Sequence, residues 1–74
     1  MKLTDIDEKE KVEITDITPN PDSERLQVLG MVEGCEICPI MKNDNGVLVD
    51  VRGCRYAIGN DLAECILVKR ITPQ

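Results

Sequence analysis

Four cysteines are the residues of this chain with the clearest chemical potential. Cys35 and Cys38 stand three apart in the segment C-E-I-C, and the other two are Cys54 and Cys65. Thiolates at this spacing bind zinc or form redox-active pairs when they lie on a turn. On a strand they point to opposite faces, and the following Pro39 does not favour a turn. We therefore expect buried or incidental thiols, with a metal site of Cys35, Cys38, Cys54 and Cys65 as the alternative.

Catalytic chemistry has little support in the composition. The sequence contains no histidine, which removes the usual partner of a serine or cysteine nucleophile and the usual base near neutral pH. It also contains no G-x-x-x-x-G-K-[ST] segment with which to hold a nucleotide phosphate. We predict that the protein is not an enzyme and needs no cofactor.

Size and charge narrow the choice of partners. The chain has 74 residues, a net charge of −5 and a single aromatic residue, Tyr56. That length suits one domain, residues 1–74, and the negative charge and lack of aromatic platforms disfavour nucleic acid. No apolar run approaches the length of a membrane span and the N-terminus is acidic, so we expect a cytoplasmic protein without direct membrane insertion.

Alternation of apolar and polar residues predicts five short strands. They are placed at residues 11–17, 35–42, 47–52, 54–58 and 65–71, with one helical turn at 61–64. In the second strand, one face is expected to carry Cys35, Ile37, Pro39 and Met41, and the proline suggests an edge or a bulge. The segment N-D-N-G at residues 43–46 predicts a hairpin with a type I′ turn, and Gly53 predicts a turn into the fourth strand.

One helix is predicted between the first two strands. Asn20 suits its N-cap, Pro21 its first position, and Gly30 the left-handed residue after its end, which gives about two and a half turns. Leu26 and Leu29 are the expected core positions. The predicted fold is therefore all-β with a short helix, as a small five-stranded barrel, because closure removes unpaired strand edges.

The segment from Arg25 to Gly34, R-L-Q-V-L-G-M-V-E-G, resembles the helix and turn of the ferrous iron transport protein A (FeoA) family. The likeness extends to the hairpin V-L-V-D-V-R-G and to G-C-R-Y-A-I, with Ala57 in the usual alanine place. Two residues depart from the family pattern: Glu33 stands where proline is common, and Cys54 where tyrosine is common. The resemblance implies an SH3-like barrel with a helical insertion after the first strand.

The resemblance also implies a function. Members of the family are accessory proteins of bacterial ferrous iron uptake, which contact the cytoplasmic GTPase part of the FeoB permease. Two alternatives remain: a thiol-based metal-binding module, such as a metallochaperone or sensor, or a detached regulatory domain like the C-terminal SH3-like domain of iron-dependent repressors. Homo-oligomer formation stays open.

Two sets of residues follow from this interpretation. The first is explained by folding and consists of Leu26, Leu29, Gly30, Gly34, Gly53 and Ala57. The second is the candidate partner-binding set around the helix and the turn after it, and consists of Arg25, Gln27, Val28, Met31, Val32 and Glu33.

Overall fold

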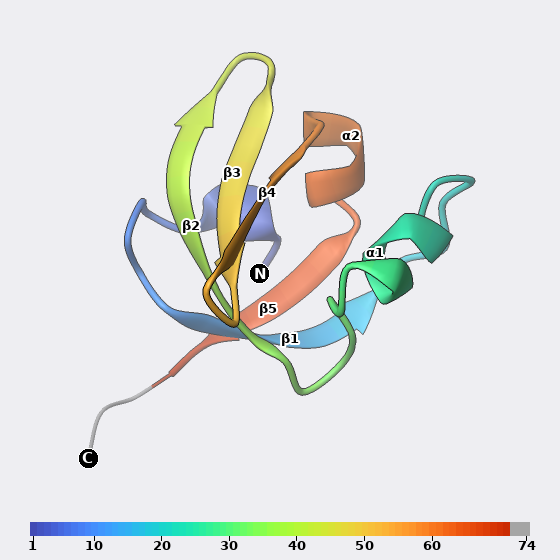
Figure 1. The fold of residues 1–74 in the computed structure, drawn as a ribbon, viewed down its shortest axis with the longest axis horizontal. Helices are drawn as coiled ribbons and strands as arrows, with labels where there is room; N and C mark the ends of the chain where they lie inside the picture. The colour runs from blue at the N-terminus through green and yellow to red at the C-terminus, as the bar shows by residue number, and fades with distance from the viewer. Residues whose placement is uncertain (72–74) are drawn as a thin grey trace.

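The computed structural model describes residues 1–71 as five antiparallel strands with three short helical segments (Figure 1). The strands are β1 (Val12–Ile17), β2 (Glu36–Asn43), β3 (Gly46–Val51), β4 (Cys54–Ile58) and β5 (Ile66–Arg70). The helical segments are η1 (Leu3–Asp5), α1 (Glu24–Val28) and α2 (Asn60–Ala63). All five predicted strands, the helix between β1 and β2 and the helical turn before β5 are present.

The strands form one sheet in the order β4-β3-β2-β1-β5. Within residues 1–71 no pairing joins β4 to β5, so the sheet is not closed, and neither the predicted barrel nor its SH3-like character is confirmed. The outer edge of β5 is partly covered by the N-terminus: Lys2 bridges to Leu67, and the Val68 amide donates to the Met1 carbonyl at 2.7 Å. A closed barrel would require β4 to pair with the outer edge of β5, where Met1 and Lys2 lie.

The core is aliphatic and follows the expected alternation. Val47, Val49 and Val51 of β3 are buried, while the residues between them are half-buried on the other face. Val12 and Ile14 of β1 are buried in the same way. Because side chains alternate faces along a strand, these positions lie on one face of the sheet, and they form one cluster with buried residues of the helical segments such as Leu3 and Leu26.

Met41 lies on the other face from the one predicted for it. Pro39 pairs with Val49 and Met41 with Leu48, so one extra residue, Ile40, is inserted into β2. This bulge confirms the prediction for Pro39, whose missing N–H cannot serve a regular ladder. Beyond the bulge the alternation is reversed, which leaves Met41 52% exposed.

The type I′ geometry predicted for the turn between β2 and β3 is found in the turn between β3 and β4 instead. At residues 43–46 neither central residue has positive φ, so the turn is not type I′; instead the Asn43 side-chain oxygen accepts hydrogen bonds from the amides of Asn45 and Gly46. The positive φ pair occurs at Arg52 (54°) and Gly53 (84°). Gly53 therefore makes the predicted turn into β4, in the geometry expected of the other hairpin.

Gly46 is required for close backbone packing against β4. A Cβ at this position would lie 2.2 Å from the Ile58 carbonyl oxygen, whereas a Cβ at Gly59 would meet nothing within 4 Å. We expect Gly46→Ala to lower the free energy of unfolding by about 2 kcal/mol, in the range of overpacking substitutions, and Gly59→Ala to change it by less than about 0.5 kcal/mol. Urea denaturation of both variants measures the difference, and equal stabilities would refute the close contact.

The helix α1 is shorter than predicted. The Asn20 side-chain oxygen accepts from the Asp22 amide at 2.9 Å, which makes a separate turn before the helix. The next amides, of Arg25 and Leu26, bond three residues back to Asp22 and Ser23, so the chain is tightly turned there before α-helical geometry begins. Asn20 is therefore a turn residue rather than the N-cap, which is Ser23.

Candidate functional site

The end of α1 is a Schellman motif, which explains most of the Arg25–Gly34 segment. Gly30 has φ +86°, its amide donates to the Gln27 carbonyl at 3.0 Å, and the Met31 amide donates to the Leu26 carbonyl at 2.8 Å. In this motif the residue after the glycine packs against the residue that accepts its amide. Leu26 and Met31 are accordingly both fully buried.

Met31 is thus a correction to the candidate partner-binding set. Its side chain is 0% exposed, because the Schellman motif directs it into the core beside Leu26. It belongs with Leu26 and Leu29, which is partly buried against the same cluster.

A tight turn follows from Val32 to Cys35 and joins α1 to β2. The Cys35 amide donates to the Val32 carbonyl at 3.0 Å, and Gly34, the third residue of the turn, has φ +86°. These are the features of a type II turn, in which the second residue is commonly proline. Glu33 occupies that second position, which gives a physical reason for the proline that is usual there.

We expect Glu33→Pro to raise the free energy of unfolding by about 0.5–1 kcal/mol, because proline restricts the unfolded chain and suits this turn position. The Glu33 amide donates to no backbone carbonyl among the turn and loop hydrogen bonds, so the substitution removes no bond of that kind. Thermal unfolding at neutral pH measures the effect. A lower melting temperature would show that the turn is not type II.

Three of the predicted residues line one hollow beside α1. Gln27, Val32 and Glu33 form its rim, and the hollow has a volume of about 450 Å³. Its other lining residues are Ile17, Pro19 and Ser23. These three were missed from the sequence; the two prolines of T-P-N-P were the available signal, since proline cannot donate to a strand ladder and so marks the end of β1.

Val28 is the most exposed large apolar side chain near the hollow. It is 85% exposed on α1, and Val32 is 41% exposed on the following turn. Val32 lines the hollow, and Val28 follows Gln27, which lines it too; within residues 1–71 both valine side chains are without cover. We call Gln27, Val28, Val32 and Glu33 the α1 surface.

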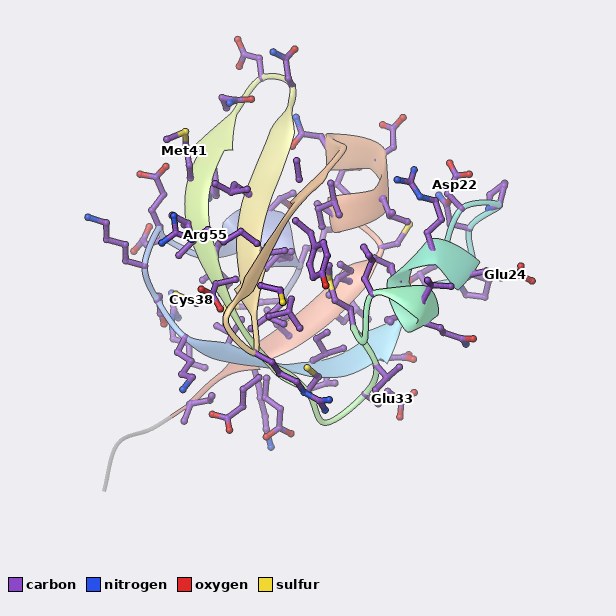
Figure 2. All side chains as sticks on the ribbon, viewed as in Figure 1. Asp22, Glu24, Glu33, Cys38, Met41 and Arg55 are labelled. Carbon is purple, nitrogen blue, oxygen red and sulfur yellow. The ribbon has the colours of Figure 1, made fainter. Side chains whose placement is uncertain are left out.

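The charges around the α1 surface are mainly negative. Asp22 and Glu24 project from α1 and the turn before it, and Glu33 projects from the turn after it (Figure 2). All three are exposed. Arg25 is exposed as well, but it lines a different hollow, together with Asp22, Asp44 and Asp61, on the side of α1 that faces the β2–β3 turn. Arg25 is thus outside the α1 surface.

The four cysteines do not gather at one place, although Cys35 and Cys38 line the same hollow. Cys35 is buried, Cys54 is exposed at the start of β4, and Cys38 and Cys65 are partly buried. The Cys65 thiol donates to the Asp61 carbonyl at 3.4 Å and accepts from the Asn20 amide group at 3.5 Å. Among residues 1–71, no group of three or more His, Cys, Asp or Glu side chains is arranged to hold a metal ion. The structure therefore does not bring together the four ligands of the alternative metal site.

Cys54 is next to Tyr56, two residues along the same face of β4. Hydrogen bonding of the phenol to Cys54 and repulsion by the negative charge of the Cys54 thiolate raise the pKa of Tyr56 above its ordinary 10.0. The protonated phenol is thus favoured in the folded protein, and this contribution to stability is lost as the pH rises through the folded-state pKa.

We expect Cys54→Ser to lower the pKa of Tyr56 toward its ordinary value. Tyr56 is the only tyrosine, and there is no tryptophan, so alkaline absorbance titration reports this residue alone. The control is Cys38→Ser, which changes a thiol elsewhere. Identical titration curves for all three proteins would refute the contact.

The remaining fold-defining residue, Ala57, is exposed on β4, the strand at one end of the sheet. In the part of the chain that the structure describes, no helix is long and apolar enough to cross a bilayer.

Comparison with known proteins identifies the fold. The chain superposes on the solution structure of a FeoA protein from Chlorobium tepidum with a TM-score of 0.87 and 24% identity, covering 97% of this chain and 71% of that one. A crystal structure titled iron uptake regulatory protein (FeoA) gives a TM-score of 0.86 and 24% identity over 96% of each chain. ScaR with bound Cd²⁺ gives 0.84 and 22% identity over 96% of this chain, but only 35% of ScaR is covered.

Among curated proteins, no relative matches the chain in sequence. The family model for the FeoA domain, however, matches residues 1–70. This match spans the whole described sheet, the helices and the Arg25–Gly34 segment. The chain belongs to the FeoA domain family.

Proposed function

We propose that the protein is a non-enzymatic accessory protein of bacterial ferrous iron uptake, which acts in the cytoplasm by binding the cytoplasmic GTPase part of the FeoB permease. Family membership supports the role in ferrous iron transport. The resemblance also implies an SH3-like barrel, for which the support is five antiparallel strands with a helix inserted between β1 and β2.

The observation that carries the binding role is the α1 surface. It combines exposed Val28 and Val32 with a hollow of about 450 Å³. Apolar side chains that surround a concave site and are rimmed by charges are typical of a protein interface. The residues that build its scaffold, Leu26, Gly30 and Gly34, are accounted for by the Schellman motif and the type II turn, whereas the exposed residues have no folding role in the structure.

The rim charges specify the partner's chemistry. Glu33 lines the hollow of the α1 surface, Glu24 is exposed on α1, and the whole chain has a net charge of −5. A complementary partner would present lysine or arginine side chains around an apolar patch. Attraction of this kind is screened by salt, so the association should weaken as ionic strength rises.

The test is binding of the purified chain to the cytoplasmic domains of the permease, measured by calorimetry at low and at physiological ionic strength. We expect a complex at both, with weaker affinity at the higher ionic strength. The chain has no phosphate-binding loop, so it would not hold the nucleotide by that route. Absence of binding at low ionic strength would refute the proposal.

A further inference from the structure

Strand β4 is an edge strand of the sheet, and in residues 1–71 no other strand pairs with its outer edge. It pairs with β3 over five consecutive residue pairs without a register shift, from Val47↔Ile58 to Val51↔Cys54. The opposite end, β5, is bridged by Lys2 and Met1. A regular strand without proline or bulge is a template for one more strand, because its outward amides and carbonyls are ready to pair.

The hairpin geometry shows which backbone groups face outward. Arg52 and Gly53 form a two-residue turn, so the closing pair Val51 and Cys54 exchanges hydrogen bonds, and the bonding positions then alternate along the strand. The backbone of Tyr56 faces β3, and that of Arg55 and Ala57 faces away. Across residues 1–71, no turn, loop or side-chain hydrogen bond engages Arg55 or Ala57.

The side chains of the same two residues are also available. Both are exposed, on the outer face of the sheet. Arg55 has no carboxylate within salt-bridge distance in the described structure; its cross-strand neighbour Asp50 accepts from the Gly53 amide instead. Ala57 lies opposite half-buried Leu48 beside a hollow of about 220 Å³. Figure 2 places Arg55 on the side of the molecule away from α1.

We propose that β4 binds an extended segment of a partner protein as a sixth, antiparallel strand. The segment carries an acidic side chain opposite Arg55 and an apolar side chain opposite Ala57, where the small methyl group leaves room. Backbone pairing supplies affinity, and these two side-chain positions supply specificity. In an antiparallel partner the apolar residue precedes the acidic one by two positions, since alternate residues share a face.

Charge favours such a segment over a second copy of this chain. If two copies of β4 paired about a two-fold axis, the outward groups would match Arg55 of one copy with Ala57 of the other. Both arginines would then lack a carboxylate and would lie diagonally across the two strands from each other, where like charges repel. An acidic segment instead neutralises the exposed basic end of an otherwise acidic protein.

This surface is separate from the α1 surface, so the two proposals can fail independently. The probe is the blocked peptide acetyl-Thr-Thr-Val-Thr-Glu-Thr-Thr-amide, titrated to millimolar concentration into the isotope-labelled protein. We expect chemical-shift changes centred on the amides of Arg55 and Ala57. Replacing the glutamate of the peptide by lysine should weaken binding about tenfold, because a favourable cross-strand pair becomes a repulsive one.

Two protein variants sharpen the test. The Arg55→Glu variant should no longer bind the glutamate peptide and should bind the lysine peptide instead. A purely structural role of Arg55 would not produce this reversal of peptide preference. Ala57→Pro removes one outward amide while keeping the β3 ladder, and should abolish binding with an unchanged circular dichroism spectrum. If the Ala57→Pro variant does not fold, the test uses the wild-type protein with a peptide that is N-methylated at its pairing amide, and this peptide should not bind.

Three results would overturn the proposal: no shifts at millimolar peptide, shifts centred on α1 instead of β4, or concentration-dependent shifts at Arg55 and Ala57 without peptide. The last would mean that a second copy occupies this edge.

Discussion

Leu26→Ala is expected to lower the free energy of unfolding by about 3 kcal/mol. Leu26 is fully buried on α1, and its carbonyl accepts the Met31 amide that completes the Schellman motif. Truncation leaves a cavity between α1 and the sheet that the neighbouring side chains fill only in part. A domain of this size has roughly 3–5 kcal/mol of net stability, so much of the variant should be unfolded at physiological temperature. Urea denaturation followed by circular dichroism measures the loss.

Two neighbouring truncations serve as controls for Leu26→Ala. Val28→Ala removes a side chain that is 85% exposed and replaces a β-branched residue by a better helix former, so the stability should change by less than about 0.5 kcal/mol. Leu29→Ala, at a partly buried position, should lie between the two. If Val28→Ala cost as much as Leu26→Ala, the orientation of α1 would be wrong.

Local pattern was sufficient where the side chains of a strand alternate without interruption. Val47, Val49 and Val51 face the core as the sequence predicts. The pattern failed at Met41, because an inserted residue reverses every later side chain, and the sequence signalled a bulge at Pro39 without its exact place. It also could not decide closure of the sheet, since that depends on how the N-terminal residues Met1 and Lys2 pack against β5.

The turns illustrate a second limit of local pattern. Asn45 and Gly46 have the composition of a type I′ turn, but the Asn43 side chain bonds the two amides and stabilises a different geometry. Arg52 adopts positive φ, which its residue type disfavours, because the two-residue connection between β3 and β4 requires it. Tertiary pairing therefore determined the turn type at both sites.

The candidate site was predictable where exposure follows from helix geometry. Gln27 and Val28 project from α1 as expected, and Val32 and Glu33 are exposed on the next turn. Met31 was assigned to the wrong set although a capping rule was available: the residue after a C-terminal glycine packs inward. The hollow itself could not be predicted, because it depends on where the end of β1 at Ile17 and the following connection at Pro19 lie relative to α1.

Val28→Lys is expected to weaken binding of the permease's cytoplasmic domains by at least about tenfold, which corresponds to about 1.4 kcal/mol. Complex formation would remove water from the lysine charge at the apolar centre, which is unfavourable. The lysine would also repel the basic side chains that we expect on the partner, because the surroundings of α1 are acidic. Calorimetric titration at low ionic strength measures the loss. Val32→Lys should act in the same direction, because Val32 lines the adjoining hollow.

Met41→Lys is the matched control, since it places the same charge at another exposed apolar position. Met41 is 52% exposed on β2, on the other side of the molecule from α1 (Figure 2). It should bind the permease domains like the wild type, with an unchanged melting temperature for all three variants. Glu33→Gln, which removes one rim charge, should reduce the salt dependence of binding while leaving the apolar contact in place. Equal losses in Val28→Lys and Met41→Lys would mean that added positive charge, rather than the α1 surface, controls the association.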